Sequence, residues 1–153
     1  AKRFPIGASG IVYIIFDPTA LNSPGSLLTI FPLFFQAFGA GPIEIDLFFG
    51  TDADEDGMII DCFNRNHESL KTCLSVVRIN PTINDIGTKL PPEFEIPSDG
   101  IPATALLGGN AGETIVTNAR KDGKYTFRLT NTESNAARGA IALNWLEFIT
   151  PVT

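Results

Sequence analysis

Glycine and proline interrupt this sequence at short intervals along its whole length. The chain of 153 residues contains 14 Gly and 11 Pro, and they are spread through it rather than gathered in one linker. Proline inside a helix removes a backbone hydrogen bond, and glycine weakens both helices and strands. The spacing therefore predicts many short elements joined by turns.

The apolar runs between these breaks have the composition of β-strands. Residues 10–16 (GIVYIIF) are β-branched and aromatic on both faces, which predicts a strand covered on both sides. Residues 43–49 (IEIDLFF) instead alternate, with Glu44 and Asp46 on one face, which predicts a half-buried strand. Further strands are predicted over residues 27–31, 33–38, 58–63, 74–79, 94–96, 104–107, 113–119, 124–131 and 139–149.

These predicted strands define the fold class. No segment has a clear helical pattern, and the residues KDG at 121–123 predict a hairpin between residues 113–119 and 124–131. About eight to ten short strands with frequent turns are typical of an antiparallel β-sandwich, of jelly-roll or immunoglobulin-like type. The length suits one domain with a substantial core, so we expect a single sandwich over residues 1–153.

Acidic charge is concentrated in residues 51–62 (TDADEDGMIIDC). From Glu44 to Asp61 there are seven carboxylates and no Lys, Arg or His. Carboxylates this close repel one another unless they face solvent or share a cation. In the spacing Asp-x-Asp-x-Asp-Gly, three carboxylates can converge on one ion, Gly57 permits the turn, and a backbone carbonyl adds a ligand. The sequence predicts a Ca²⁺ site formed by Asp52, Asp54, Asp56, the Met58 carbonyl and Asp61; the alternative is a solvated acidic loop.

This run is similar to the calcium loops of many unrelated proteins, but it differs from the EF-hand. Strands rather than helices are predicted on both sides of it, and Phe63 stands where the EF-hand has a bidentate Glu. Asp61, or Asp46 across the predicted hairpin, can take that place. We therefore expect a stabilising ion within a β-hairpin, or an ion between subunits, rather than a regulatory switch.

Two cysteines, Cys62 and Cys73, follow the acidic run with ten residues between them. Their even number and short separation predict a local disulfide, and the alternative is a pair of buried thiols. A zinc site is not supported, because His67 is the only other soft ligand nearby and there is no Cys-x-x-Cys. A disulfide together with calcium predicts a secreted or cell-surface location.

Other features of the sequence exclude whole classes of function. The net charge of −6 argues against nucleic acid or an anionic membrane as the partner. The most apolar stretch, residues 27–40, is interrupted by Pro32 and Gln36, so no membrane span is predicted. His67 is the only histidine, and no Gly-x-Ser-x-Gly or phosphate-binding loop is present. We expect a protein that is not an enzyme and has no catalytic residues.

The apolar N-terminal third of the sequence is the last feature that bears on function. Residues 10–49 hold more than half of the twelve Phe residues. A sheet with one solvent-exposed face cannot bury that much apolar strand surface. The surplus predicts self-association through these strands, and the alternative is burial between two sheets. The overall prediction is a secreted, calcium-stabilised structural or adhesive subunit of a filament or surface layer. The alternative is a calcium-dependent carbohydrate-binding module, although Trp145, Tyr13 and Tyr125 are expected in the core rather than on a sugar-binding face.

Overall fold

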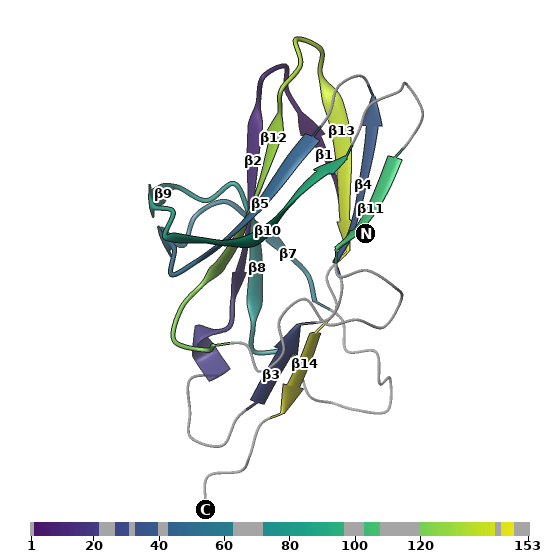
Figure 1. The fold of residues 1–153 in the computed structure, drawn as a ribbon. Coiled ribbons are helices and arrows are strands. Elements are labelled where there is room, and N and C mark those ends of the chain that lie inside the picture. Colours follow the sequence, from purple (N-terminus) through teal and green to yellow (C-terminus); the bar gives the residue numbers. More distant parts are fainter. Residues whose placement is uncertain are drawn as a thin grey trace, which may run out of the picture.

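The computed structural model describes residues 2–21, 27–30, 33–39, 43–62, 72–96, 103–107, 120–142 and 145–148. These residues form β-strands and one short 3-10 helix, η1 (Thr19–Leu21) (Figure 1). The strands are β1 (Lys2–Ile6), β2 (Ile11–Asp17), β3 (Leu27–Ile30), β4 (Leu33–Gly39), β5 (Ile43–Phe49), β6 (Asp52–Ala53), β7 (Met58–Ile60), β8 (Val76–Ile79), β9 (Ile83–Asp85), β10 (Thr88–Ile96), β11 (Ala103–Leu107), β12 (Tyr125–Asn131), β13 (Ala137–Ala142) and β14 (Trp145–Phe148).

The strands pair antiparallel in two larger sheets and two small ones. One larger sheet has the order β1-β13-β4-β11, and the other has the order β10-β5-β12-β2-β8-β7. The small sheets are the pairs β14-β3 and β6-β9. The prediction of an all-β antiparallel fold is therefore confirmed. The described part of the chain contains no helix with the length and apolar content that a membrane crossing needs.

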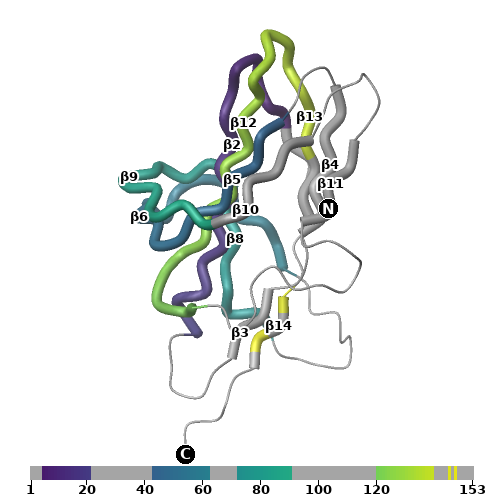
Figure 2. Tube along the Cα trace, in the orientation of Figure 1, coloured from purple at the N-terminus to yellow at the C-terminus, as the bar shows by residue number. Residues whose placement is uncertain are grey.

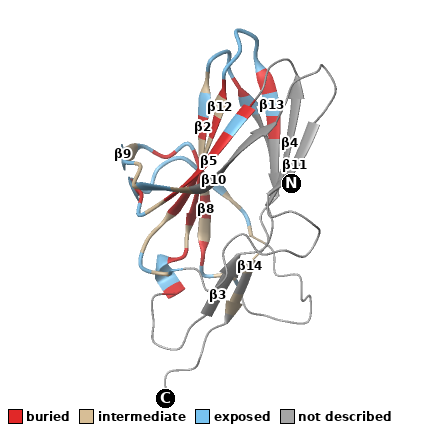
Figure 3. Ribbon diagram, in the orientation of Figure 1, coloured by how far each residue is buried: buried red, intermediate tan, exposed pale blue. Residues whose placement is uncertain are grey.

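The core contains residues of both larger sheets, and Figure 3 shows its buried segments along β2, β5, β8 and β12 and in β13. Ile6 of β1 and Ala137 of β13 belong to the same buried cluster as Ile14, Leu47 and Phe127 of the six-stranded sheet. Burying a side chain of the size of Leu or Phe contributes about 1.5–3 kcal/mol, so this cluster holds the two sheets together. The result is the predicted β-sandwich; the choice between a jelly-roll and an immunoglobulin-like strand order stays a prediction.

The alternation in β12 explains which residues enter this core. Tyr125, Phe127 and Leu129 are all buried and point to one side of the strand. Phe127 pairs across the sheet with Leu47 of β5 and Ile14 of β2, so a continuous apolar row crosses three strands. Cross-strand pairs of this kind are the unit of sheet stabilisation.

The outer face of the six-stranded sheet is also covered around Thr126. Ile15, Phe48 and Thr126 lie on that face and are only 2%, 5% and 0% exposed. Thr51 lies over them, because its Oγ1 is 2.6 Å from Oγ1 of Thr126 and donates to the Ile86 carbonyl at 2.8 Å. β2, predicted to be covered on both sides, is therefore covered only in part on this face, because Ile15 is buried, Tyr13 is half-buried and Ile11 is 47% exposed.

Three pairings differ from the sequence-based expectation. The acidic run does not lie in a hairpin, because β12, β2 and β8 stand between β5 and β7. The predicted closing strand is two strands, β13 in the four-stranded sheet and β14 beside β3. β12 is paired on both sides, with β5 and β2, while its predicted hairpin partner, residues 113–119, lies outside the described residues. Alternation identifies a strand and its faces, but it does not identify the neighbouring strand.

Candidate functional site at the acidic lobe

The acidic run folds back onto the six-stranded sheet as a small lobe, which protrudes beside β5 in Figure 2. We call residues 51–57 and 80–87 the acidic lobe. Within it β6 pairs with β9, so that Asp52 stands opposite Asp85. Asn80 joins the lobe to β2, because its N–H donates to the Tyr13 carbonyl at 2.8 Å and its Oδ1 accepts from the Tyr13 N–H at 2.9 Å.

The carboxylates of this lobe contact the neighbouring segment rather than one another. Asp56 accepts from the backbone N–H of Thr82 at 2.7 Å and from its hydroxyl at 2.6 Å. Asp54 accepts from Nδ2 of Asn84 at 3.0 Å. The hydrogen bonds from the hydroxyl and N–H of Thr82 hold the pKa of Asp56 below its ordinary value. The two carboxylates thus fasten the turn to residues 82–84.

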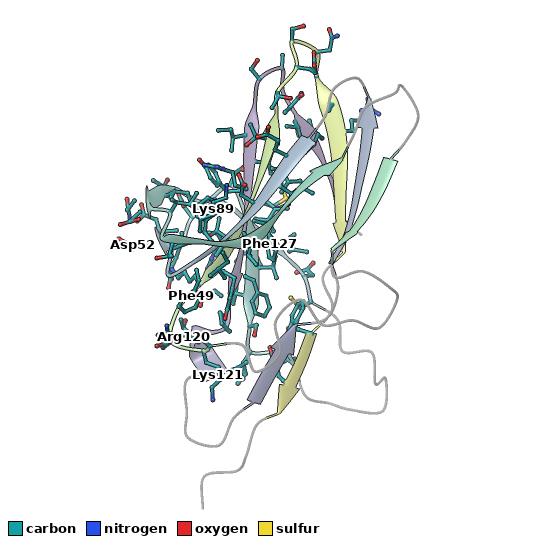
Figure 4. All side chains as sticks on the ribbon, viewed as in Figure 1. Phe49, Asp52, Lys89, Arg120, Lys121 and Phe127 are labelled. Atoms are coloured by element: carbon teal, nitrogen blue, oxygen red, sulfur yellow. The ribbon has the colours of Figure 1, made fainter. Side chains whose placement is uncertain are left out.

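This arrangement bears directly on the predicted calcium site. Asp52, Asp54, Asp56, Met58 and Asp61 are all exposed, and Figure 4 shows Asp52 at the margin of the molecule. Among the described residues, no three His, Cys, Asp or Glu side chains gather closely enough to hold a metal ion. Asp54 and Asp56 are thus oriented by Asn84 and Thr82, and an ionised carboxylate has further lone pairs with which it can bind a cation. The calcium site stays a prediction.

Gly57 has the turn-forming role that the sequence pattern assigns to it. Its φ is +80°, and a Cβ at this position would lie 2.6 Å from the Ile79 carbonyl oxygen. Both the backbone conformation and the close approach therefore require glycine. The sharp turn brings the chain from the acidic lobe directly into β7.

Asp46, the alternative calcium ligand, has other partners. Its carboxylate is 2.9 Å from Nζ of Lys89 and 2.7 Å from a guanidinium nitrogen of Arg128, whose guanidinium lies over the Phe48 ring. Burial acts to raise the pKa of Asp46, but the hydrogen bonds and charges of Lys89 and Arg128 hold it below its ordinary value. Alternation in the sequence places these charges on strand faces, but it does not reveal that the three strands are neighbours.

A further feature that sequence analysis missed is the edge of the six-stranded sheet. β7 is the last strand of that sheet and pairs with β8, with Ile59 opposite Arg78. Met58 is 51% exposed and Ile59 is 56% exposed. In sequence these residues look like those of any core strand, so nothing except the strand order marks them as an edge.

The cysteines do not form the predicted disulfide in this structure. Cys62 and Cys73 are both free and partly buried. The Cys62 thiol donates to the Ile60 carbonyl at 3.6 Å. Burial, together with the neighbouring Cys73 thiol, raises the pKa of Cys62 to about 12. A thiol that stays protonated at neutral pH is a poor nucleophile.

Two of the three aromatic residues considered for sugar binding pack against the core. Tyr125 is buried in the core, and Trp145 packs edge-on against the Phe16 ring with centroids 5.1 Å apart. The prediction that these two residues serve the core is confirmed. Tyr13, also expected in the core, is only partly buried and lies on the opposite face of β2 from the core residues Val12 and Ile14. His67 and Phe63 lie outside the described residues. A comparison with protein-family models, curated proteins and solved structures finds no match to this chain.

Proposed function

We propose that this chain is a non-enzymatic structural or adhesive module that functions outside the cell and associates through the edge of β7 that has no neighbour among the described strands. The observation that carries the proposal is the exposure of Met58 and Ile59, 51% and 56%, on the last strand of the larger sheet. An edge strand presents unpaired backbone N–H and C=O groups, which is a template for pairing with another strand. Adjacent exposed apolar side chains add to the attraction of such an edge.

The strand order decides which of the apolar strands is available for this role. β2 and β4, in the apolar N-terminal third, each have a neighbour on both sides. β7 has β8 as its only neighbour among the described strands. Self-association is therefore better served by β7 than by β2 or β4; β3, in the same third, likewise has one neighbour, β14, among the described strands.

A second copy of the chain is the partner that matches this edge. If two β7 strands pair antiparallel about Ile59, each Ile59 meets its equivalent and Met58 meets Ile60 of the second copy. The same pairing brings Asp61 beside Gly57 and Asp56 of the second copy. These like charges oppose the association, and a divalent cation held between the copies would remove the repulsion. This is how the predicted Ca²⁺ would stabilise the assembly.

Symmetry limits what this contact can build. Pairing of identical edges about a two-fold axis closes as a dimer. A filament or surface layer therefore requires a second contact between dimers. We propose the dimer as the building unit, in an oxidising, calcium-containing extracellular environment.

The experiment compares oligomeric state by light scattering after gel filtration, with calcium and with EDTA. The test variant is Ile59→Lys, and the matched control is Ile11→Lys, because Ile11 is an isoleucine of similar exposure, 47%, on another strand. We expect a dimer in calcium for the wild type and for Ile11→Lys, and a monomer in EDTA and for Ile59→Lys. A wild-type monomer in both conditions, or equal effects of the two substitutions, would refute the proposal.

Calcium titration by calorimetry separates two positions for the ion. An ion between copies is lost in Asp61→Asn and binds more weakly when the protein is diluted to the monomer. An ion within one chain is lost in Asp54→Ala and is insensitive to dilution. If the wild type releases no heat of binding, the calcium part of the proposal is wrong. Glycan binding by monomeric Ile59→Lys in the presence of calcium would favour the carbohydrate-binding alternative instead.

A further inference from the structure

The two cysteines lie at the junction between the six-stranded sheet and the β3–β14 pair. Cys62 follows β7 by two residues, and Cys73 precedes β8 by three. β7 and β8 are paired with Ile60 opposite Val77, and continuing this register places Cys62 opposite Ser75. The Cys73 thiol is also close enough to contribute to the raised pKa of the Cys62 thiol. Both thiols therefore lie at the same end of one strand pair.

The same end of β8 is the attachment point of β14, which lies below β8 in Figure 1. Glu147 of β14 accepts from the backbone N–H groups of Leu74 at 2.8 Å and Ser75 at 2.9 Å. It also accepts from the Trp145 indole N–H at 2.9 Å. Three donors on one partly buried carboxylate form a strong, charge-assisted clamp. The clamp holds the two residues that directly follow Cys73.

We propose that Cys62 and Cys73 are a dithiol–disulfide couple that locks the backbone segment gripped by Glu147. In the reduced state residues 72–75 are held by the Glu147 clamp and by the strand pairing that follows. In the oxidised state a covalent bond also ties Cys73 to the end of β7, so Leu74 and Ser75 cannot leave Glu147 unless β7 moves with them. Oxidation therefore tightens the attachment of β14 to the larger sheet.

The oxidation needs an external electron acceptor, which we take to be a low-molecular-weight disulfide. One S–S bond forms between Cys62 and Cys73, and one S–S bond of the acceptor breaks. The two thiol hydrogens and their electrons pass to the acceptor, which becomes two thiols. This inference does not depend on the association through β7, so either proposal can fail without the other.

The chain contains a reporter for this junction. Trp145 is its only tryptophan, and it contacts both Glu147 and the Phe16 ring. Its fluorescence therefore follows the position of β14 on the core. The backbone amides of Leu74 and Ser75 report on the clamp itself through hydrogen exchange, because an amide exchanges when its hydrogen bond opens.

The test uses the whole folded chain, reduced with dithiothreitol or treated with oxidised glutathione. Intact-mass analysis should show the loss of two hydrogens without a glutathione adduct, and peptide mapping should link Cys62 to Cys73. We expect the amides of Leu74 and Ser75 to exchange more slowly by about tenfold or more after oxidation. A change in Trp145 emission should accompany the slower exchange.

Two variants complete the design. In Cys73→Ser, oxidation should leave the exchange of Leu74 and Ser75 unchanged. In Glu147→Gln, the weakened clamp should exchange faster in the reduced state, and oxidation should recover part of the loss. A persistent glutathione adduct, or no linkage in the folded protein, would overturn the pairing. A linkage that leaves both amides exchanging at the reduced rate would overturn the lock.

Discussion

Replacing Asp46 with Asn tests how much the buried charge cluster contributes to stability. Removing one partner of a fully buried ion pair costs about 3–5 kcal/mol, whereas an exposed pair contributes about 0–1 kcal/mol. The Asp46 side chain is only 7% exposed, but those of Arg128 and Lys89 are 32% and 41% exposed. Water can therefore solvate the two cations that the substitution leaves behind. We expect Asp46→Asn to lower the free energy of unfolding by about 2 kcal/mol.

Urea unfolding at neutral pH measures this loss, and Glu44→Gln is the matched control. Glu44 lies on the same strand and is exposed, so its loss should stay within about 0.5 kcal/mol. The pH dependence adds a second check. Because the folded pKa of Asp46 lies below its ordinary value of 3.8, the stabilisation is complete above that value and disappears as the pH falls through the folded pKa. The wild-type and Asp46→Asn curves should therefore converge in acid.

Two results would contradict this account of Asp46. If Asp46→Asn lowers the free energy of unfolding no more than Glu44→Gln does, the solvated cations Arg128 and Lys89 do not need the Asp46 charge. A difference between wild type and Asp46→Asn that stays constant well below the ordinary pKa would show that packing, rather than charge, accounts for the loss. Equal slopes of unfolding free energy against urea are required for either comparison.

Three further predictions can be measured in the same way. Gly57→Ala should lower the free energy of unfolding by about 2 kcal/mol, because the new Cβ would lie 2.6 Å from a carbonyl oxygen at a φ of +80°. The control Gly7→Ala should cost under about 0.5 kcal/mol, because a Cβ there would have nothing within 4 Å. Similar losses for the two variants would contradict the turn geometry. Thr51→Val should destabilise more than Thr126→Val, by about 1 kcal/mol, because the Thr51 hydroxyl has two partners; the reverse order would contradict the assigned bonds. Glu147→Gln should cost about 1 kcal/mol at neutral pH. Burial acts to raise the Glu147 pKa, but hydrogen-bond donors hold it below its ordinary value of 4.5. The stability lost in Glu147→Gln, measured by tryptophan-monitored unfolding, should therefore disappear as the pH falls below 4.5. A loss that persists in acid would count against the clamp.

The sequence predicted the strands whose alternation is regular and the class of fold they build. Residues 43–49 form β5 with the predicted bounds, and the buried face of β12 is the predicted one. Of residues 10–16, Val12, Ile14, Ile15 and Phe16 are buried, so both apolar faces of β2 are covered at Ile14 and Ile15. These predictions succeeded because each depends on which side of one strand is apolar, a property that a local stretch of sequence contains.

The pairing order and the partners of the acidic turn could not be predicted in the same way. The run from Asp52 to Asp56 has calcium-loop spacing, yet Asp54 and Asp56 bond to Asn84 and Thr82, about 26 to 30 positions further along the chain. No local pattern indicates that residues 80–87 return to this turn. The exposed edge of β7 is hidden for a similar reason, since an edge strand is defined by the neighbour it lacks.

The pairing order also has a consequence for the time course of folding. β1 and β4 pair with β13, and β3 pairs with β14, so strands from residues 2–39 find their partners in residues 137–148, which are synthesised much later. Contacts between residues so distant along the chain form slowly, because a large loop must close first. Until β13 and β14 are made, the apolar residues 27–39 lack these neighbours. An aggregation-prone intermediate therefore persists while the residues between β4 and β13 are synthesised, and a chaperone that shields residues 27–39 would raise the yield of native protein.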